Sequence, residues 1–328
     1  MRVARDFRHA DKDRDGRLSR SEWNRRGNFE YLDKNSDENL SLQEVRALYK
    51  GHDNRGYDWP PKGMSKPVVK IDLSINADRV GREALDYQTL CGISRSKICE
   101  VLHQRERGLI ETGTGPRFPG NAHCASIDDY WAMDYSNKRT RRAYHGGIDI
   151  PVQWGTPMLA VAAGSVVAKY QAHNSKRGIE LVLRHSPEQT GLSIWTYSAY
   201  GHLDIMPDLA IGQRVKMGQI IGPTGNSGIS GRGGRRSGQS AYRRPAIHLA
   251  MFYSDVRTFS EANNTIIPVN GRWLDPMAFY RKQMPFDSMT IRKLPDTEKE
   301  VSIPVMFTDG KTFPADTKLI WPYACQRK

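Results

Sequence analysis

A series of short β-prone runs between about residues 127 and 253 limits how this chain can fold more than any other feature. Glycine, proline and asparagine turns separate the runs, which include residues 166–168, 180–183, 193–197 and 247–252. Short apolar runs bounded by turn residues are typical of β-strands. The pattern therefore favours a mainly antiparallel β domain.

The rest of the chain divides around this domain by composition. We expect a multidomain α+β protein in which residues 1–50 form a charged helical module and 51–116 a linker with a helical segment. The β domain would span 117–285, and the tail at 286–328 would pack on it. A length of 328 residues leaves room for two or three domains.

Apolar spacing predicts two helices between about residues 77 and 107. Val80, Ala84 and Leu90 fit one amphipathic helix. Ser94 is the expected N-cap of a second helix that continues past Val101.

The N-terminal module contains a twelve-residue pattern typical of an EF-hand calcium loop. Gly16 stands where the loop turns sharply. The oxygen donors come from Asp11, Asp13, Asp15, the carbonyl of Arg17, and Glu22. So many carboxylates at this spacing would repel one another without a cation, which predicts bound Ca²⁺ with a structural role.

A second loop repeats the pattern with one departure. Its donors are Asp33, Asn35, Asp37, Asn39 and Glu44. Glu38 takes the place of the glycine, so a left-handed backbone there costs strain and weaker calcium binding is expected. Leu18 and Leu40 occupy equivalent positions and are predicted to pair through a short β bridge.

Two separated segments supply a candidate zinc site. His145 and Asp149 flank a Gly-Gly pair that allows a tight backbone, while Ala246 and His248 share one face of a predicted strand. Two imidazoles and one carboxylate suit a catalytic zinc ion with an open position for water. His145, Asp149 and His248 are therefore the predicted metal ligands.

With these residues the chain resembles the lysostaphin-type (LytM-like) zinc metallopeptidases, endopeptidases that cut peptide cross-links in peptidoglycan. The resemblance covers roughly residues 117–280 and follows the family's motif order. The matching segments are 145–151, 155–157, 160–167, 183–185, 200–203, 212–215, 218–222 and 224–228.

The resemblance also assigns roles. The family's last motif is Pro-His-hydrophobic-His, whose second histidine binds zinc and whose first assists catalysis beside the histidine of the Tyr-x-His-Leu motif. Here Pro245 anchors an alignment in which His248 is the ligand and Ala246 the lost catalytic position. A competing register would pair His248 with Ala250 and lose a ligand instead.

The implied mechanism uses the metal to polarise a water and the scissile carbonyl, with His202 and a second histidine orienting the water and stabilising the oxyanion. Losing one such group costs about 10²–10⁴ in rate. We therefore expect a chain that binds zinc and substrate but turns over poorly or not at all. Natural loss and deliberate inactivation give the same sequence, and the completeness of the other motifs favours deliberate inactivation.

Four cysteines allow three disulfide pairings, of which we expect Cys91–Cys99 and Cys124–Cys325 in an exported protein. No apolar leader or membrane-length run is visible, so either the sequence is that of the mature protein or export takes another route. We expect a periplasmic or secreted monomer. The net charge of +13 indicates a polyanionic partner. Peptidoglycan is the partner that the resemblance implies.

Two other functions fit the sequence less well. One is a non-catalytic, degenerate peptidase fold that binds cell wall or regulates other hydrolases. The other is a calcium-controlled nucleic-acid binder, which rests only on the single Gly/Arg-rich segment at 231–238, better explained as a basic loop beside the substrate groove. His185 matches the family but is expected to be structural, and the sequence contains no HExxH helix, P-loop or GxSxG elbow.

Overall fold

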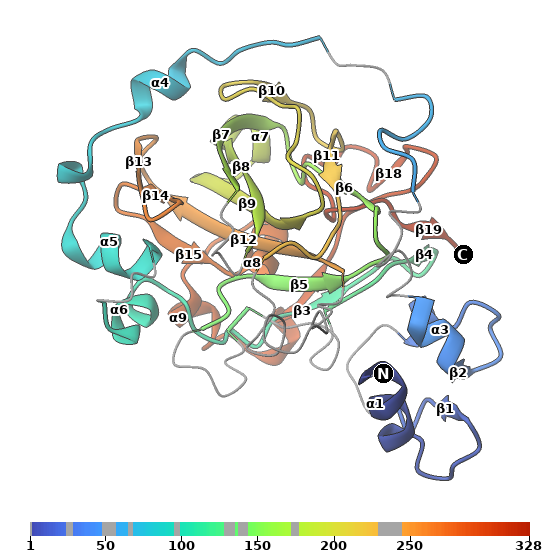
Figure 1. Ribbon diagram of the computed structural model, residues 1–328. Helices are drawn as coiled ribbons and strands as arrows, with labels where there is room; N and C mark the ends of the chain where they lie inside the picture. Colours follow the sequence, from blue (N-terminus) through green and yellow to red (C-terminus); the bar gives the residue numbers. More distant parts are fainter. Residues whose placement is uncertain are drawn as a thin grey trace, which may run out of the picture.

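The computed structural model describes residues 2–23, 29–47, 57–64, 68–94, 99–127, 135–136, 144–171, 177–228 and 245–328. Within these residues, the central sheet runs in the order β10-β7-β8-β9-β12-β15, and β5 also pairs with β12 (Figure 1). The strands are β5 (Ile148–Pro151), β7 (Gly164–Gln171), β8 (Ile179–His185), β9 (Trp195–Leu203), β10 (Arg214–Val215), β12 (Ala246–Ser254) and β15 (Arg272–Leu274). Every pairing in this sheet is antiparallel, which confirms the predicted β domain.

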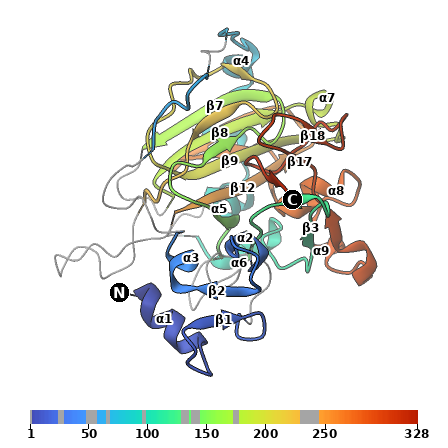
Figure 2. The same cartoon turned by 90° about the vertical axis from the view of Figure 1, so that its right-hand side faces the viewer.

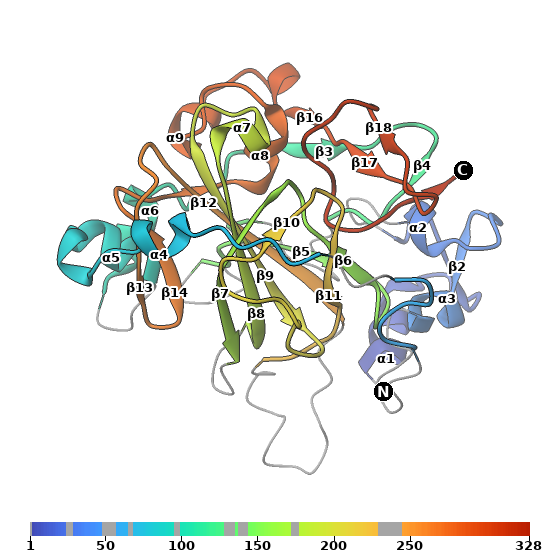
Figure 3. The ribbon, with the colours of Figure 1, turned by 90° about the horizontal axis from the view of Figure 1, so that it is seen from above.

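The central strands are buried on both faces. All but one residue of β12 and all but the first of β9 are buried. Figure 3 shows β6 (Pro157–Leu159) and β11 (Ile220–Pro223) on one side of the sheet and the hairpin of β13 (Phe259–Ala262) and β14 (Thr265–Pro268) on the other. The remaining short helix of this region is α7 (Pro187–Thr190).

The N-terminal module has its own small core and a short two-stranded sheet. Its elements are α1 (Arg2–Ala10), β1 (Arg17–Ser19), α2 (Phe29–Leu32), β2 (Asn39–Ser41) and α3 (Leu42–Ala47). Leu18 pairs with Leu40, as the repeat predicts. The module lies beside β4 (Ala122–His123), and Figure 2 shows it below the strands of the β domain. The Tyr31 ring stacks on the His123 ring at 5.4 Å.

The segment before the β domain is less helical than predicted. It contains α4 (Ser74–Asp78), η1 (Arg82–Ala84), α5 (Tyr87–Ser94) and α6 (Val101–Glu106). The helix expected around Val80 does not form, because the Val80 amide donates to the Phe259 carbonyl along β13. The helix begins instead after Asp86, whose carboxylate accepts the Thr89 amide.

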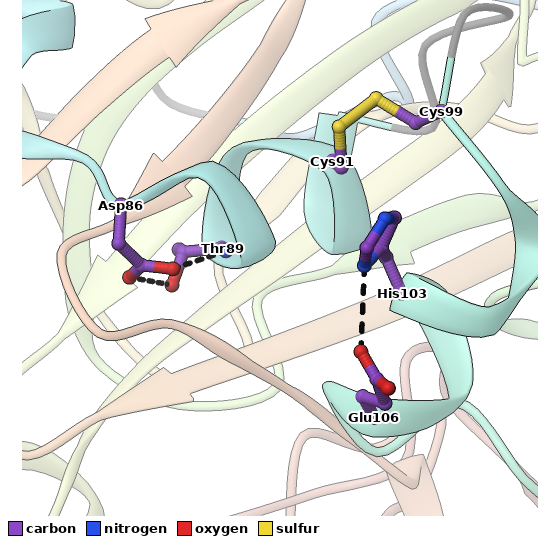
Figure 4. The surroundings of a disulfide bond; sticks show 6 residues. All are labelled: Asp86, Thr89, Cys91, Cys99, His103 and Glu106. Atoms are coloured by element: carbon purple, nitrogen blue, oxygen red, sulfur yellow. Dashed lines mark hydrogen bonds and ion pairs between the residues drawn. A yellow bond between two sulfur atoms is a disulfide. The ribbon is translucent and has the colours of Figure 1, made fainter.

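The predicted cap of the second helix is also wrong. Ser94 is the last residue of α5, and Glu100 is the N-cap residue of α6. The expected Cys91–Cys99 disulfide joins α5 to the residues just before α6 (Figure 4).

The C-terminal residues return to the start of the β domain. Strand β16 (Glu300–Ser302) pairs in parallel with β3 (Gly115–Arg117), and β19 (Gln326–Arg327) pairs with β4. The predicted Cys124–Cys325 disulfide closes this contact. The other elements here are α8 (Pro276–Arg281), α9 (Ser288–Ile291), η2 (Asp296–Glu298), β17 (Val305–Met306) and β18 (Thr312–Phe313). Throughout the described parts of the chain, every helix is too short or too polar to cross a membrane.

Candidate metal centre

Three strands bring the predicted ligands together. Strand β12 lies between β5 and β9, with Asp149 opposite His248 on one side and Gly201 opposite His248 on the other. His145 precedes β5, and His202 follows Gly201. The register places His248, rather than Ala250, beside the carboxylate.

The geometry of this cluster fits a zinc ion. Asp149 Oδ1 lies 3.3 Å from His145 Nε2 and 2.9 Å from His248 Nδ1. Zinc bonds of roughly 2.0–2.2 Å at tetrahedral angles place neighbouring ligand atoms about 3.3 Å apart. All three side chains are buried, and Asp149 is only 1% exposed. A buried carboxylate between two imidazoles is a donor set that a divalent metal ion would hold together.

A glycine gives the ligands room to meet. Gly147 has a φ of +152°, and a Cβ added there would lie 2.7 Å from His248 Cε1. Any other residue would therefore push the His248 ring away from the cluster. The spacing between His145 and Asp149 needs this glycine, as the sequence indicates.

His202 faces the cluster from β9. Its Nδ1 lies 2.9 Å from the Ser227 carbonyl and must donate to it, because a carbonyl oxygen can only accept. Its Nε2 is then directed to the metal side, 4.0 Å from Asp149 Oδ1. The residue has a φ of +63°, which is strained for a side chain of this size.

Ala246 offers only a methyl group at the position where the family motif has a histidine. It is 1% exposed, and its amide donates to the Gly225 carbonyl at 3.3 Å. Residues two apart on a strand share a face at a separation of about 7 Å. Ala246 therefore lies on the same face as His248 and supplies no group that can move a proton.

His185 belongs to the core rather than to the metal cluster. Its Nδ1 donates to the Ala163 carbonyl, and its Nε2 lies 2.7 Å from the Ser198 hydroxyl. Burial lowers the pKa of this imidazole to about 4. The side chain is therefore neutral in the folded protein at neutral pH.

The first acidic loop is shaped for a cation. Oxygens of Asp11, Asp13 and Asp15 lie within 4.8 Å of one another. Asp11 is 8% exposed, and its Oδ1 is a buried oxygen without a hydrogen-bond partner. Hydrogen bonds from the Ser19 amide and hydroxyl lower the pKa of Glu22 to about 2, which keeps this carboxylate charged.

The second loop has the same backbone and carries the expected strain. Glu38 has a φ of +61°, against +83° for Gly16 at the equivalent position. The Asp33 carboxylate accepts the Glu38 amide at 3.0 Å, as Asp11 accepts the Gly16 amide at 3.1 Å. The remaining predicted donors, Asn35, Asp37, Asn39 and Glu44, lie on the same loop.

Two residues near His202 were not predicted. Asp204 and Tyr57 are joined by a hydrogen bond, and Tyr57 comes from the segment before the β domain. No motif or spacing marks either residue. The Gly/Arg-rich segment at 231–238 lies outside the described residues.

Comparison with known proteins identifies the part of the chain that holds the cluster. Residues 143–253 match the model of Peptidase family M23. We refer to this matched region as the M23 domain. It contains His145, Asp149, His202 and His248, while the N-terminal loops and the C-terminal residues lie outside it. No curated protein matches the chain.

Several solved structures resemble the domain. The catalytic domain of an alanine-to-histidine mutant of EnpA, a prophage-encoded M23 protein from Enterococcus faecalis, is 23% identical over 42% of this chain and 85% of its own, with a TM-score of 0.29. The catalytic domain of lysostaphin from Staphylococcus simulans is 25% identical over 42% and 79%, with a TM-score of 0.29. A zinc-containing peptidase from Vibrio cholerae is 19% identical over 50% and 38%, with a TM-score of 0.27. TM-scores this low add nothing to the family match.

Proposed function

We propose that this chain is a zinc-binding M23 protein directed at the peptide cross-links of peptidoglycan, and that Ala246 impairs its turnover. The observation that carries the proposal is the buried cluster of His145, Asp149 and His248, whose ligand atoms have zinc-like separations inside the M23 domain. M23 peptidases act on peptidoglycan, and a basic chain suits that acidic polymer. Two disulfides favour a location outside the cytoplasm.

The side chains divide into three roles. His145, Asp149 and His248 would hold the metal, which when bound supplies a Lewis acid and lowers the pKa of water. His202 Nε2 is oriented to accept a proton or hold a water, because Nδ1 is committed to the Ser227 carbonyl. Ala246 cannot stabilise the developing oxyanion. We therefore expect the chain to retain substrate binding while its turnover is lost.

Restoring the histidine tests this proposal. The zinc-loaded Ala246→His protein should cleave purified sacculi about 10²–10⁴ times faster than the chain with Ala246. In the same background, His202→Ala should remove the gain while leaving one zinc per chain. Metal content and thermal unfolding of each variant show that the fold and the site survive.

The runner-up function is a non-catalytic wall-binding or regulatory protein. Ala246 is the observation that favours it. A folded, zinc-loaded Ala246→His protein that binds sacculi without cleaving them would establish this second function and exclude the peptidase.

The N-terminal loops are proposed calcium sites of unequal strength. Support comes from the buried, unpartnered Asp11 Oδ1 and from the strained Glu38 backbone. Relieving a left-handed residue gains about 1–2 kcal/mol, so Glu38→Gly should bind calcium roughly tenfold more tightly at the second loop. Glu38→Ala removes the same charge but keeps a Cβ, and should show no such gain. Calorimetric titration that finds no calcium bound to the native chain would rule out both sites.

A further inference from the structure

Tyr57 connects the segment after the calcium loops to the M23 domain beside His202. Its hydroxyl donates to Asp204 Oδ2. Its ring lies against Gly155, where an added Cβ would come 2.4 Å from Tyr57 Cγ. The ring and the hydroxyl thus make separate contacts with the domain.

Both contacts reach the main chain that shapes the site. Asp204 follows His202 by two residues, and its Cα would lie 2.6 Å from a Cβ on Gly225. The Gly225 amide donates to the His202 carbonyl at 2.9 Å, and the Gly225 carbonyl accepts the Ala246 amide. Gly225 therefore joins the two positions on which catalysis depends, and Asp204 packs directly against it.

The second contact supports the same turn from the other side. The Gly155 amide donates to the Thr224 carbonyl at 2.8 Å, next to Gly225. Tyr57 covers Gly155 at this point. A single side chain is thus in contact with both segments that border the Thr224–Gly225 backbone.

His202 needs such support because its backbone is strained. A positive φ at a residue of this size costs on the order of 1–3 kcal/mol and persists only when the surroundings fix it. The His202 amide donates to the Arg177 carbonyl at 2.8 Å, and its own carbonyl accepts from Gly225. Of these two hydrogen bonds, Tyr57 can affect the one from Gly225, because Asp204 packs against Gly225.

We propose that Tyr57 is a positioning residue for His202, acting through Asp204 and Gly225. The proposal rests on the proposed peptidase function and adds to it a residue outside the M23 match at 143–253. It makes the segment that follows the calcium loops part of the catalytic unit. The hydroxyl is the critical group, since Asp204 is the residue that touches Gly225.

Kinetics in the Ala246→His background test the role. Tyr57→Phe keeps the ring over Gly155 but removes one hydrogen bond. It should lower kcat roughly 3- to 10-fold, with KM changed less than about twofold. Asp204→Asn keeps an acceptor oxygen and should retain kcat. Asp204→Ala should match Tyr57→Phe, and the double variant should be no slower than either. Tyr87→Phe, at a tyrosine that is 63% exposed, is the matched control.

Amide exchange in the native zinc-loaded chain provides a readout without catalysis. The Gly225 amide should exchange about tenfold faster in Tyr57→Phe and unchanged in Tyr87→Phe. Unchanged kcat in an active Tyr57→Phe enzyme, or a loss confined to KM, would overturn the proposal. If Ala246→His shows no cleavage, the peptidase function fails, and Gly225 exchange alone decides whether Tyr57 holds this backbone.

Discussion

His145 and Asp149 can approach each other because Gly146 and Gly147 lie between them. Gly147 packs against the His248 ring with no room for a Cβ. This local requirement is visible in the sequence as a Gly-Gly pair between two metal-binding side chains. His248 lies 99 residues after Asp149, and no local spacing links the two. It was predicted from the strand face that it shares with Ala246 and from the donor set it completes, and the motif order of a known family supported the choice.

Burial of His185 makes stability depend on pH. Its pKa falls from an ordinary 6.5 to about 4 because the charged form would be desolvated. Between these values the unfolded chain binds a proton that the folded chain does not, so the free energy of unfolding falls as the pH falls through this window. The loss is about 3 kcal/mol in total.

Urea unfolding at pH 7, 5.5 and 4.5 measures this effect. His185→Gln removes the titrating group, so the free energy of unfolding of this variant should fall by about 3 kcal/mol less than that of the unsubstituted protein as the pH is lowered. This difference does not depend on how stable the variant is at pH 7. Parallel curves for the two proteins would contradict the assignment.

At the scale of elements, the segment from 68 to 81 runs past β10 and then along β13, with only the short helix α4 in it, and the helix predicted from about residue 77 does not form there. The Arg214 amide donates to the Lys70 carbonyl, and Arg79 forms a β bridge with Phe259. Pairing with a distant edge overrides local helical periodicity. The sequence predicted the strands of the sheet well because their runs are buried and bounded by turns, but it could not show which segments would cover the edges.

A buried ion pair fixes helix α4 to the sheet. Asp78 lies 2.7 Å from Arg184 Nη1, and both side chains are buried, while Arg257 reaches the other carboxylate oxygen at 3.0 Å. Asp78→Ala would leave the Arg184 charge buried without a carboxylate, which costs about 3–5 kcal/mol. Unfolding in guanidinium chloride should show this loss of stability.

Asp58→Ala is the control. It removes an 80% exposed carboxylate near Lys62 and should cost under about 1 kcal/mol. Equal losses in the two variants would show that the buried pair contributes no more than a surface pair.

For the whole molecule, the two disulfides close loops of very different size. Both pairings were predicted, as one of the three sets that four cysteines allow, but their structural roles were not. Cys91 and Cys99 are 8 residues apart and join neighbouring helices, whereas Cys124 and Cys325 are 201 residues apart and enclose the entire M23 domain. The parallel pairing of β3 with β16 reinforces this second closure and has no signature in the sequence.

Loop size sets the expected stabilisation. Chain entropy assigns roughly 5 kcal/mol to the Cys124–Cys325 bond and roughly 2.5 kcal/mol to Cys91–Cys99. Replacing each pair by alanines and measuring denaturant unfolding without reductant compares them directly. Equal losses, or a larger loss for Cys91–Cys99, would refute the entropic account for this protein.

The long closure also has a consequence for biosynthesis. Cys124 is made 201 residues before Cys325, an interval of roughly 10–40 s at ordinary elongation rates. Cys91 meets Cys99 almost at once, so the small ring can close while the large one cannot. Throughout that interval the Cys124 thiol has no native partner, and an oxidant that acts early would join it to Cys91 or Cys99 instead.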